Sequence, residues 1–240
     1  MGANNFLLSD ISELGVTAAA EFSLSALIAT TIFRACNAIY WKRKTGSFFP
    51  IEHSNFFMLD DNGERKVKWM NVLGITIRPF INMSFQVSII LAFQNATKAE
   101  LNSGVITAMF ATYCIFTAVF SWIFFGEKLS LKFAVGIGLM MSCVVCISAS
   151  AFFGNNKLSL DEVLHTYYAL GYGLLAPLLI SISISVARYF TINHGYSSLS
   201  YTIDNFTAIG IIELPFFIYF DALRPYTFRE VGFGIGAGFF

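Results

Sequence analysis

Three polar side chains at regular spacing in an apolar stretch are the strongest chemical signal in the sequence. Arg78, Asn82 and Gln86 recur at every fourth residue, a spacing that places them along one face of a helix. Ionisable groups inside a membrane span are costly and usually face a cavity or a partner. The stripe therefore indicates a path for a polar solute, and interhelical hydrogen bonds, worth about 0.6 kcal/mol each, are the structural alternative.

Two further cations have open interpretations. Arg34 has Thr30 and Asn37 at helical spacing, so it either lines the same path or extends to the membrane edge. Lys98 follows an apolar stretch and, together with Arg78, suits an anionic solute.

Two acids, Asp204 and Glu213, share residues 198–220. Nine residues separate them, so they point to opposite helix faces and form no carboxylate pair. Asp204 is expected at the interface. Glu213 precedes Pro215, which frees a backbone carbonyl, and it is either a proton or cation site or a neutral packing residue. The substrate-path candidates are Arg34, Arg78, Asn82, Gln86, Lys98 and Glu213.

Motifs of enzyme chemistry are absent from the sequence. It has no HExxH, no GxSxG, no P-loop and no Gly-rich dinucleotide loop. The four cysteines lie in apolar stretches and are expected as free thiols rather than metal ligands. We therefore expect no catalytic residue, no metal and no cofactor. The net charge is zero, which gives no reason to expect nucleic acid as a partner.

The composition defines the environment in which these residues act. Of the 240 residues, 56% are hydrophobic and 12% are charged, whereas soluble domains have about 25% charged residues. So few charges do not cover a soluble surface. The composition predicts a polytopic membrane protein, with the lipid bilayer as its partner.

Six stretches are long and apolar enough to cross the bilayer as helices, each of about 20 residues. They are residues 22–41, 79–97, 101–126, 133–156, 166–187 and 198–220. The fold class is therefore all-α, a polytopic transmembrane helix bundle. The segment 231–240 is only half a span, and we expect it to be a truncated seventh helix.

The distribution of basic residues orients the spans. The loop 42–68 holds six Lys and Arg, and alternate loops bring its side to nine, against four on the other side. Cytoplasmic loops carry the excess, so this loop is predicted to be cytoplasmic. The N-terminus then lies outside the cytoplasm, which leads us to expect one helix missing upstream. The sequence does not separate the plasma membrane from internal membranes.

Residues 92–150 carry a family resemblance. An Ala-Phe pair is followed by a long apolar helix that ends in Phe125-Gly126-Glu127-Lys128-Leu129-Ser130, and Gly136 comes early in the next helix. This pattern resembles the EamA-like branch of the drug/metabolite transporter superfamily, related to sugar-phosphate and nucleotide-sugar carriers. Cys114 stands where that family usually has a proline in the helix, which implies a straight helix here.

The resemblance implies ten helices in two inverted five-helix repeats. Residues 1–156 are then the first EamA-like repeat without its first helix, and 157–240 are an incomplete second repeat. It also implies a solute carrier that moves a small organic metabolite by alternating access. The alternative is a non-transporting receptor or scaffold, and a membrane enzyme ranks third. The substrate, the coupling ion and a homodimer are left open.

The turn after residue 126 has a structural interpretation. Glu127, Lys128 and Ser130 are expected to hold the two flanking helices in a tight hairpin. Ser130 would cap the next helix, and the amides at that helix start would bind the Glu127 carboxylate. The small pair Gly104 and Ala108 is expected at a close helix contact.

Overall fold

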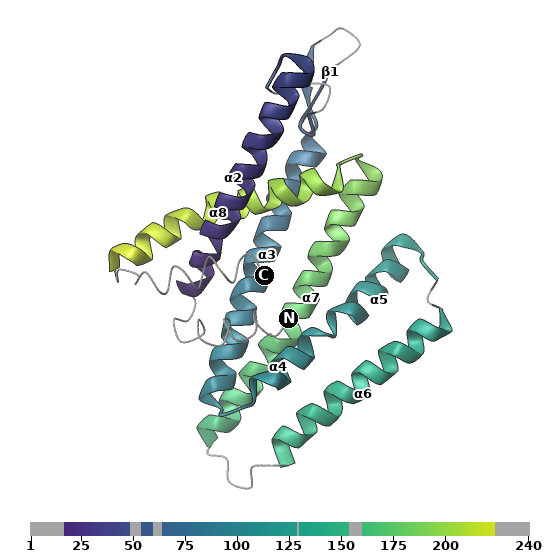
Figure 1. Cartoon of the computed structure of the whole chain (residues 1–240). Helices are drawn as coiled ribbons and strands as arrows, with labels where there is room; N and C mark the ends of the chain where they lie inside the picture. The colour runs from purple at the N-terminus through teal and green to yellow at the C-terminus, as the bar shows by residue number, and fades with distance from the viewer. Residues whose placement is uncertain (1–16, 49–53, 60–63, 129, 154–159, 224–240) are drawn as a thin grey trace.

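The computed structural model describes residues 17–48, 54–59, 64–128, 130–153 and 160–223 (Figure 1). Within them the chain is all-α apart from one short hairpin, which confirms the predicted fold class. The helices are α2 (Thr17–Thr45), α3 (Trp69–Lys98), α4 (Ser103–Phe110), α5 (Tyr113–Phe125), α6 (Leu131–Phe153), α7 (Leu160–Asn193) and α8 (Ser198–Leu223). The strands β1 (Phe57–Leu59) and β2 (Arg65–Val67) pair antiparallel.

Four of the predicted spans are long and apolar enough to cross a membrane, namely Trp69–Lys98, Ser103–Phe125, Asp161–Asn193 and Ser198–Leu223. The described part of α6 contributes a shorter apolar helix, Leu131–Cys143. Spans at 22–41 and 133–156 therefore stay predictions, as do the two repeats. The expected half-helix at 231–240 lies outside the described residues.

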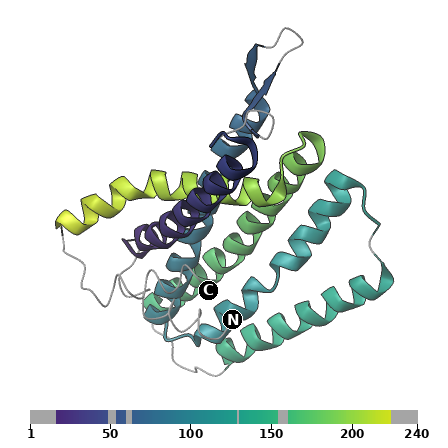
Figure 2. The same ribbon diagram turned by 45° about the horizontal axis from the view of Figure 1, so that its top comes forward.

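Helices α3 and α7 form the centre of the bundle and run antiparallel (Figures 1 and 2). Gly74, near the start of α3, lies under Phe190, near the end of α7. At the opposite end, a buried cluster joins α3, α4 and α7, with members that include Phe93, Ile106 and Ala169. Helix α8 runs across α2 and α3, whereas α5 lies against α7.

The third predicted span, residues 101–126, is interrupted, although it has no proline. Residues 101–126 form two helices separated by Ala111 and Thr112, next to Cys114. Hydroxyl groups surround the interruption, because Thr112 Oγ1 donates to Met109 O (2.7 Å) and Ser181 Oγ donates to Tyr113 O (2.9 Å). Such side-chain bonds compete with the helical pattern. Ala111 and Thr112 keep right-handed helical dihedral angles, so the helix is interrupted by a tight turn, and its straightness stays a prediction.

Close helix contacts lie at other glycines than the expected one, at Gly210 of α8 against Leu27 of α2 and at Gly74 of α3 against Phe190 of α7. Gly104 is exposed, and a Cβ built there would meet only Asn102, whose Oδ1 caps this helix start. Gly74 is buried, and a Cβ built there would lie 2.9 Å from the Phe190 ring. Because the side chain of Gly74 is absent, α7 approaches α3 closely at this point.

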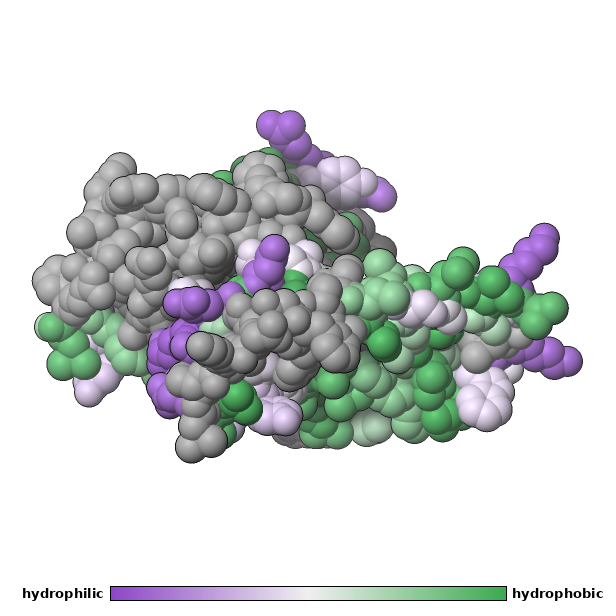
Figure 3. All heavy atoms as spheres, turned by 90° about the horizontal axis from the view of Figure 1, so that it is seen from below, coloured by the Kyte–Doolittle hydropathy of each residue, from purple (hydrophilic) through white to green (hydrophobic). Residues whose placement is uncertain are grey.

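The outer helices present an apolar surface. Figure 3 shows a largely hydrophobic face on the side where α5 and α6 lie in Figure 1. Large side chains are exposed there, among them Phe124 (70%), Leu131 (82%) and Leu139 (68%). An exposed apolar surface of this kind fits contact with lipid.

Candidate functional site

The predicted stripe on α3 begins at Arg78, which lies where three helices meet. Its Nε donates to Ser183 Oγ on α7 (3.3 Å), and its guanidinium lies 4.9 Å from the ring centroid of Tyr201 on α8. The Nη1 atom is buried and has no hydrogen-bond partner among the described residues. Ser183 therefore holds the Nε edge of the guanidinium and the Tyr201 ring holds one face, whereas the Nη1 edge has no partner among the described residues.

Asn82 and Gln86 continue the stripe one and two turns further along α3. The Asn82 Oδ1 and Gln86 Oε1 atoms are buried, and neither has a partner within the described part of the chain. Together with Arg78 they form what we call the α3 seam. Most buried polar groups in folded proteins are hydrogen-bonded, so three unpartnered atoms in one row mark a place that water or a solute completes.

Tyr201 of α8 supports the seam, and neither Tyr201 nor Asn205 was found from the sequence. Tyr201 donates its hydroxyl hydrogen to Gly74 O (2.9 Å), which fixes its ring beneath Arg78. Asn205, one turn later, is fully buried, and neither polar atom of its amide has a partner among the described residues. Both stand in an apolar stretch that gives no local sign of facing α3.

Arg34 has a different environment. Its Nη2 forms an ion pair with Asp204 Oδ1 on α8, and its Nε donates to Thr207 Oγ1 (3.2 Å). The other oxygen of Asp204 accepts a hydrogen bond from the Tyr196 hydroxyl (2.6 Å). Burial raises the pKa of Tyr196, so this hydroxyl keeps its proton and stays a donor. Asp204 is buried within the chain (8% exposed), and its pairing with Arg34 offsets its charge; its place at the membrane interface stays a prediction.

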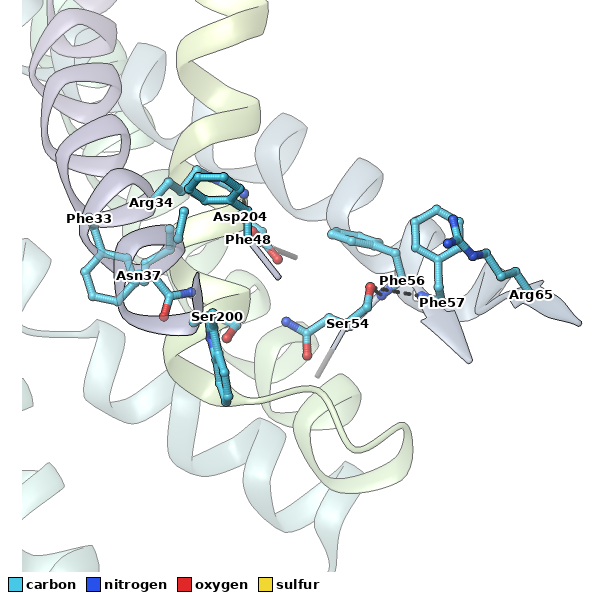
Figure 4. Close-up of a pocket in the computed structure, with 14 residues that line it drawn as sticks. Phe33, Arg34, Asn37, Phe48, Ser54, Phe56, Phe57, Arg65, Ser200 and Asp204 are labelled. Atoms are coloured by element: carbon cyan, nitrogen blue, oxygen red, sulfur yellow. Dashed lines mark hydrogen bonds and ion pairs between the residues drawn. The ribbon is translucent and has the colours of Figure 1, made fainter. Parts of the chain in front are cut away.

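A cavity of about 410 Å³ lies beside this ion pair, between α2, α8 and the hairpin (Figure 4). Arg34 and Asp204 lie at one end of it, and Phe57 and Arg65 lie at the other. Its lining mixes aromatic rings with amide and hydroxyl groups, including those of Asn37 and Ser54. The cavity opens at the end of the bundle that is predicted to face the cytoplasm.

The remaining path candidates are not brought to the seam. Lys98 is exposed at the far end of α3, 20 residues from Arg78, which is about 30 Å along a helix. Glu213 is buried (3% exposed), and its Oε2 has no partner among the described residues. It lies 12 residues beyond Tyr201, about 18 Å along α8. The structure thus separates both residues from Arg78, and their roles stay predictions.

Glu127 has a different partner from the one expected. It forms an ion pair with Arg188 on α7, whose Nη1 donates to Ser121 Oγ (3.2 Å). The Arg188 guanidinium also lies 4.6 Å from the Phe125 ring centroid. Its hydrogen bond and charge hold the pKa of Glu127 below the usual value.

The rest of the predicted hairpin is simpler. Ser130 Oγ accepts a hydrogen bond from Phe133 N (3.2 Å), so Ser130 caps α6. Lys128 is exposed. Glu127 therefore links α5 to α7 rather than to the start of α6. No local pattern signals this link, because Arg188 is 61 residues away.

Comparison with known proteins agrees with this architecture. Residues 46–149 match the model of the EamA-like transporter family, a region that contains the hairpin, α3, α4, α5 and most of α6. No curated protein and no solved structure matches the chain.

The apolar helices and this match define the class, an integral membrane protein of the transporter type. The EamA-like match confirms the resemblance to the drug/metabolite transporter superfamily.

Proposed function

We propose that the protein carries a small organic solute across the bilayer by alternating access. The observation that carries this proposal is the α3 seam, which lies inside the EamA-like region. Each buried polar group without a partner costs about 1–3 kcal/mol. Three such groups in one row are hard to explain as packing, whereas a site that binds and releases a polar solute requires groups of this kind.

The depth of the seam supports this role. Arg78 is nine residues beyond Trp69, the first residue of α3, which corresponds to about 14 Å along a helix. The hydrocarbon core is about 30 Å thick. With the start of α3 at the membrane surface, Arg78 lies near the midplane, where carriers built from repeats bind their solutes.

Two ion pairs between distant segments of the described chain close one end of the bundle. Arg34–Asp204 and Glu127–Arg188 each join a residue of the predicted first repeat to one of the second. Both pairs lie at the end of the bundle where α2, α5 and α7 end and α8 begins. Alternating access moves one repeat against the other, so opening this end requires both pairs to separate.

Transport by the purified full chain in proteoliposomes tests the proposal. The solutes are radiolabelled malate, glucose 6-phosphate, alanine and glucose, each measured by counterflow against protein-free liposomes. We expect uptake of at least one of them, and loss of that uptake in the double variant Asn82→Leu, Gln86→Leu. Ser84→Ala is the matched control, because Ser84 is exposed on the same helix and bonds only to Phe80 O.

No uptake of any of these solutes by the wild-type protein would overturn the proposal. Uptake that the double variant retains in full would leave a transporter but remove the seam as its site. A non-transporting receptor or scaffold, the alternative left by the sequence, is not favoured by the family match.

A further inference from the structure

Arg34 of helix α2 and Arg78 of helix α3 differ in the charges that face them. Arg34 pairs with Asp204, so the pair carries no net charge. Arg78 contacts the neutral side chains of Ser183 and Tyr201. Within the described residues no carboxylate forms an ion pair with Arg78.

A half-buried cation without a counterion is unfavourable, because transfer of a charge out of water is costly. A guanidinium does not escape this cost by losing its proton. Arg78 therefore lies in the bundle as a positive charge with one unpartnered edge. A bound anion at that edge is the group that would balance the charge.

Resting on the transport function above, we propose that Arg78 binds an anionic group, carboxylate or phosphate, of the transported solute. Ser183 and Tyr201 fix the orientation of the guanidinium, so its Nη1 edge is presented to the ligand in advance. Gly74 O holds the Tyr201 hydroxyl and thereby fixes the ring. Because the guanidinium is already oriented before binding, binding of the solute costs less side-chain entropy.

The rest of the seam limits the size and polarity of the solute. Asn82 and Gln86 lie one and two turns beyond Arg78, about 6 and 12 Å along the helix. Their buried amides offer hydrogen bonds to hydroxyl, amide or amino groups. The site thus fits a small organic anion with polar groups along its length, such as a hydroxy acid or a sugar phosphate, better than an inorganic ion.

Arg34 does not fit this role, although a cavity adjoins it. Its Nη2 and Nε atoms are engaged by Asp204 and Thr207. A further anion there would face the Asp204 carboxylate and be repelled by it. The anion site is therefore assigned to Arg78 alone of the two.

Binding to the purified full chain separates this inference from the transport function. Thermal shift and isothermal titration use malate for the carboxylate class, glucose 6-phosphate for the phosphate class, and inorganic phosphate and glucose as the incomplete probes. We expect one of the two organic anions to bind at least tenfold more tightly than both incomplete probes. Arg78→Gln should lower that affinity tenfold or more, and Arg78→Lys should lower it less, because it keeps the charge but not the fork of donors.

Lys132→Gln is the matched control, since it removes one positive charge from an exposed residue at the start of α6. Its affinity for the anion should equal that of the wild type. If Arg78→Gln does not fold, Arg78→Lys carries the test, and wild-type affinity in that variant would overturn the inference.

Two outcomes distinguish the inference from the function on which it rests. Counterflow of glucose or alanine that Arg78→Gln leaves unchanged, with no binding of either organic anion, would overturn the inference while transport stands. Binding of malate or glucose 6-phosphate that depends on Arg78, without any counterflow, would support the anion site and overturn the transport proposal instead.

Discussion

Arg34 and Arg78 both interrupt apolar helices, and the structure gives them opposite surroundings. Arg34 forms an ion pair with the Asp204 carboxylate. Two neutral side chains hydrogen-bond to this pair: Tyr196 donates to Asp204, and Thr207 accepts from Arg34. Arg78 meets a hydroxyl group and an aromatic ring, with one edge left over. The charge balance around an intramembrane arginine, rather than its depth, therefore separates a structural group from a candidate ligand site.

The comparison has an energetic consequence. In the Arg34–Asp204 pair the carboxylate is buried, whereas the Arg34 side chain is about half exposed. Removal of Arg34 would leave the buried carboxylate without its counterion, which is destabilising. A half-buried cation without a counterion has no such partner to lose. Substitutions should therefore destabilise the Arg34 region and spare, or even stabilise, the Arg78 region.

The largest effect is expected for Asp204→Ala. The change leaves Arg34 without its anion and Tyr196 without its acceptor, and a buried group left unsatisfied costs about 1–3 kcal/mol. We expect a sharp loss of monodisperse protein and a lower Tm in detergent, measured by size-exclusion chromatography and differential scanning fluorimetry.

A double variant is the control for that prediction. Arg34→Leu combined with Asp204→Leu removes both charges, so it should recover part of the lost Tm, because two apolar residues leave no unpaired charge. If the loss of Tm in the double variant equals the sum of the losses in the two single variants, the ion pair itself contributes nothing to stability.

The second prediction concerns Arg78→Met, the corresponding change in the other region. Methionine keeps much of the length of arginine, and the substitution removes an uncompensated charge. We expect a Tm equal to or higher than that of the wild type when no solute is present. A drop as large as that of Asp204→Ala would show that Arg78 has a structural counterion outside the described residues.

The sequence was sufficient for much of this comparison. Helical periodicity placed Arg78, Asn82 and Gln86 on one face of a helix, and the apolar stretches predicted the helices that the structure describes. Local periodicity reports only which residues share a face. It contains no information on what faces them, which is where the sequence-based interpretation stops.

The missed features are all pairings between distant residues. Asp204 is 170 residues from Arg34, and Arg188 is 61 residues from Glu127. Each acid was therefore judged without its partner. The interruption at Thr112 was missed for a related reason, because serine and threonine hydroxyls replace the proline that usually marks such a site.

The third prediction concerns Tyr201, whose ring contacts the Arg78 guanidinium and whose hydroxyl group donates to Gly74 O. Tyr201→Phe removes the hydrogen bond to Gly74 O but keeps a ring face under the guanidinium, whereas Tyr201→Leu removes both. A cation–π contact is worth about 0.5–2 kcal/mol. We expect anion affinity, measured by titration, to fall severalfold in Tyr201→Leu and less in Tyr201→Phe. Equal losses would mean that the hydroxyl, rather than the ring, positions Arg78.

The smallest effect is expected at the second ion pair, Glu127–Arg188. Both side chains are partly exposed, so solvent and salt screen their attraction, and such pairs contribute little. Glu127→Gln should lower the Tm only slightly at pH 7, and less in high salt. Arg188→Gln should have a similar effect, and combining the two should add little, because the same contact is lost in each variant.

The pH dependence of this ion pair follows from the direction in which the pKa of Glu127 is shifted. The folded-state pKa of Glu127 is lowered by Arg188, so the stabilisation is present above the usual carboxyl value and is lost as the pH falls through the lowered pKa. The Tm difference between the wild type and Glu127→Gln should therefore be constant near neutral pH and disappear in acid. Anion affinity should be unchanged, since Glu127 lies beyond the end of α5, outside the span that reaches the midplane. Loss of binding in a Glu127→Gln protein that folds normally would assign this carboxylate to the solute site instead.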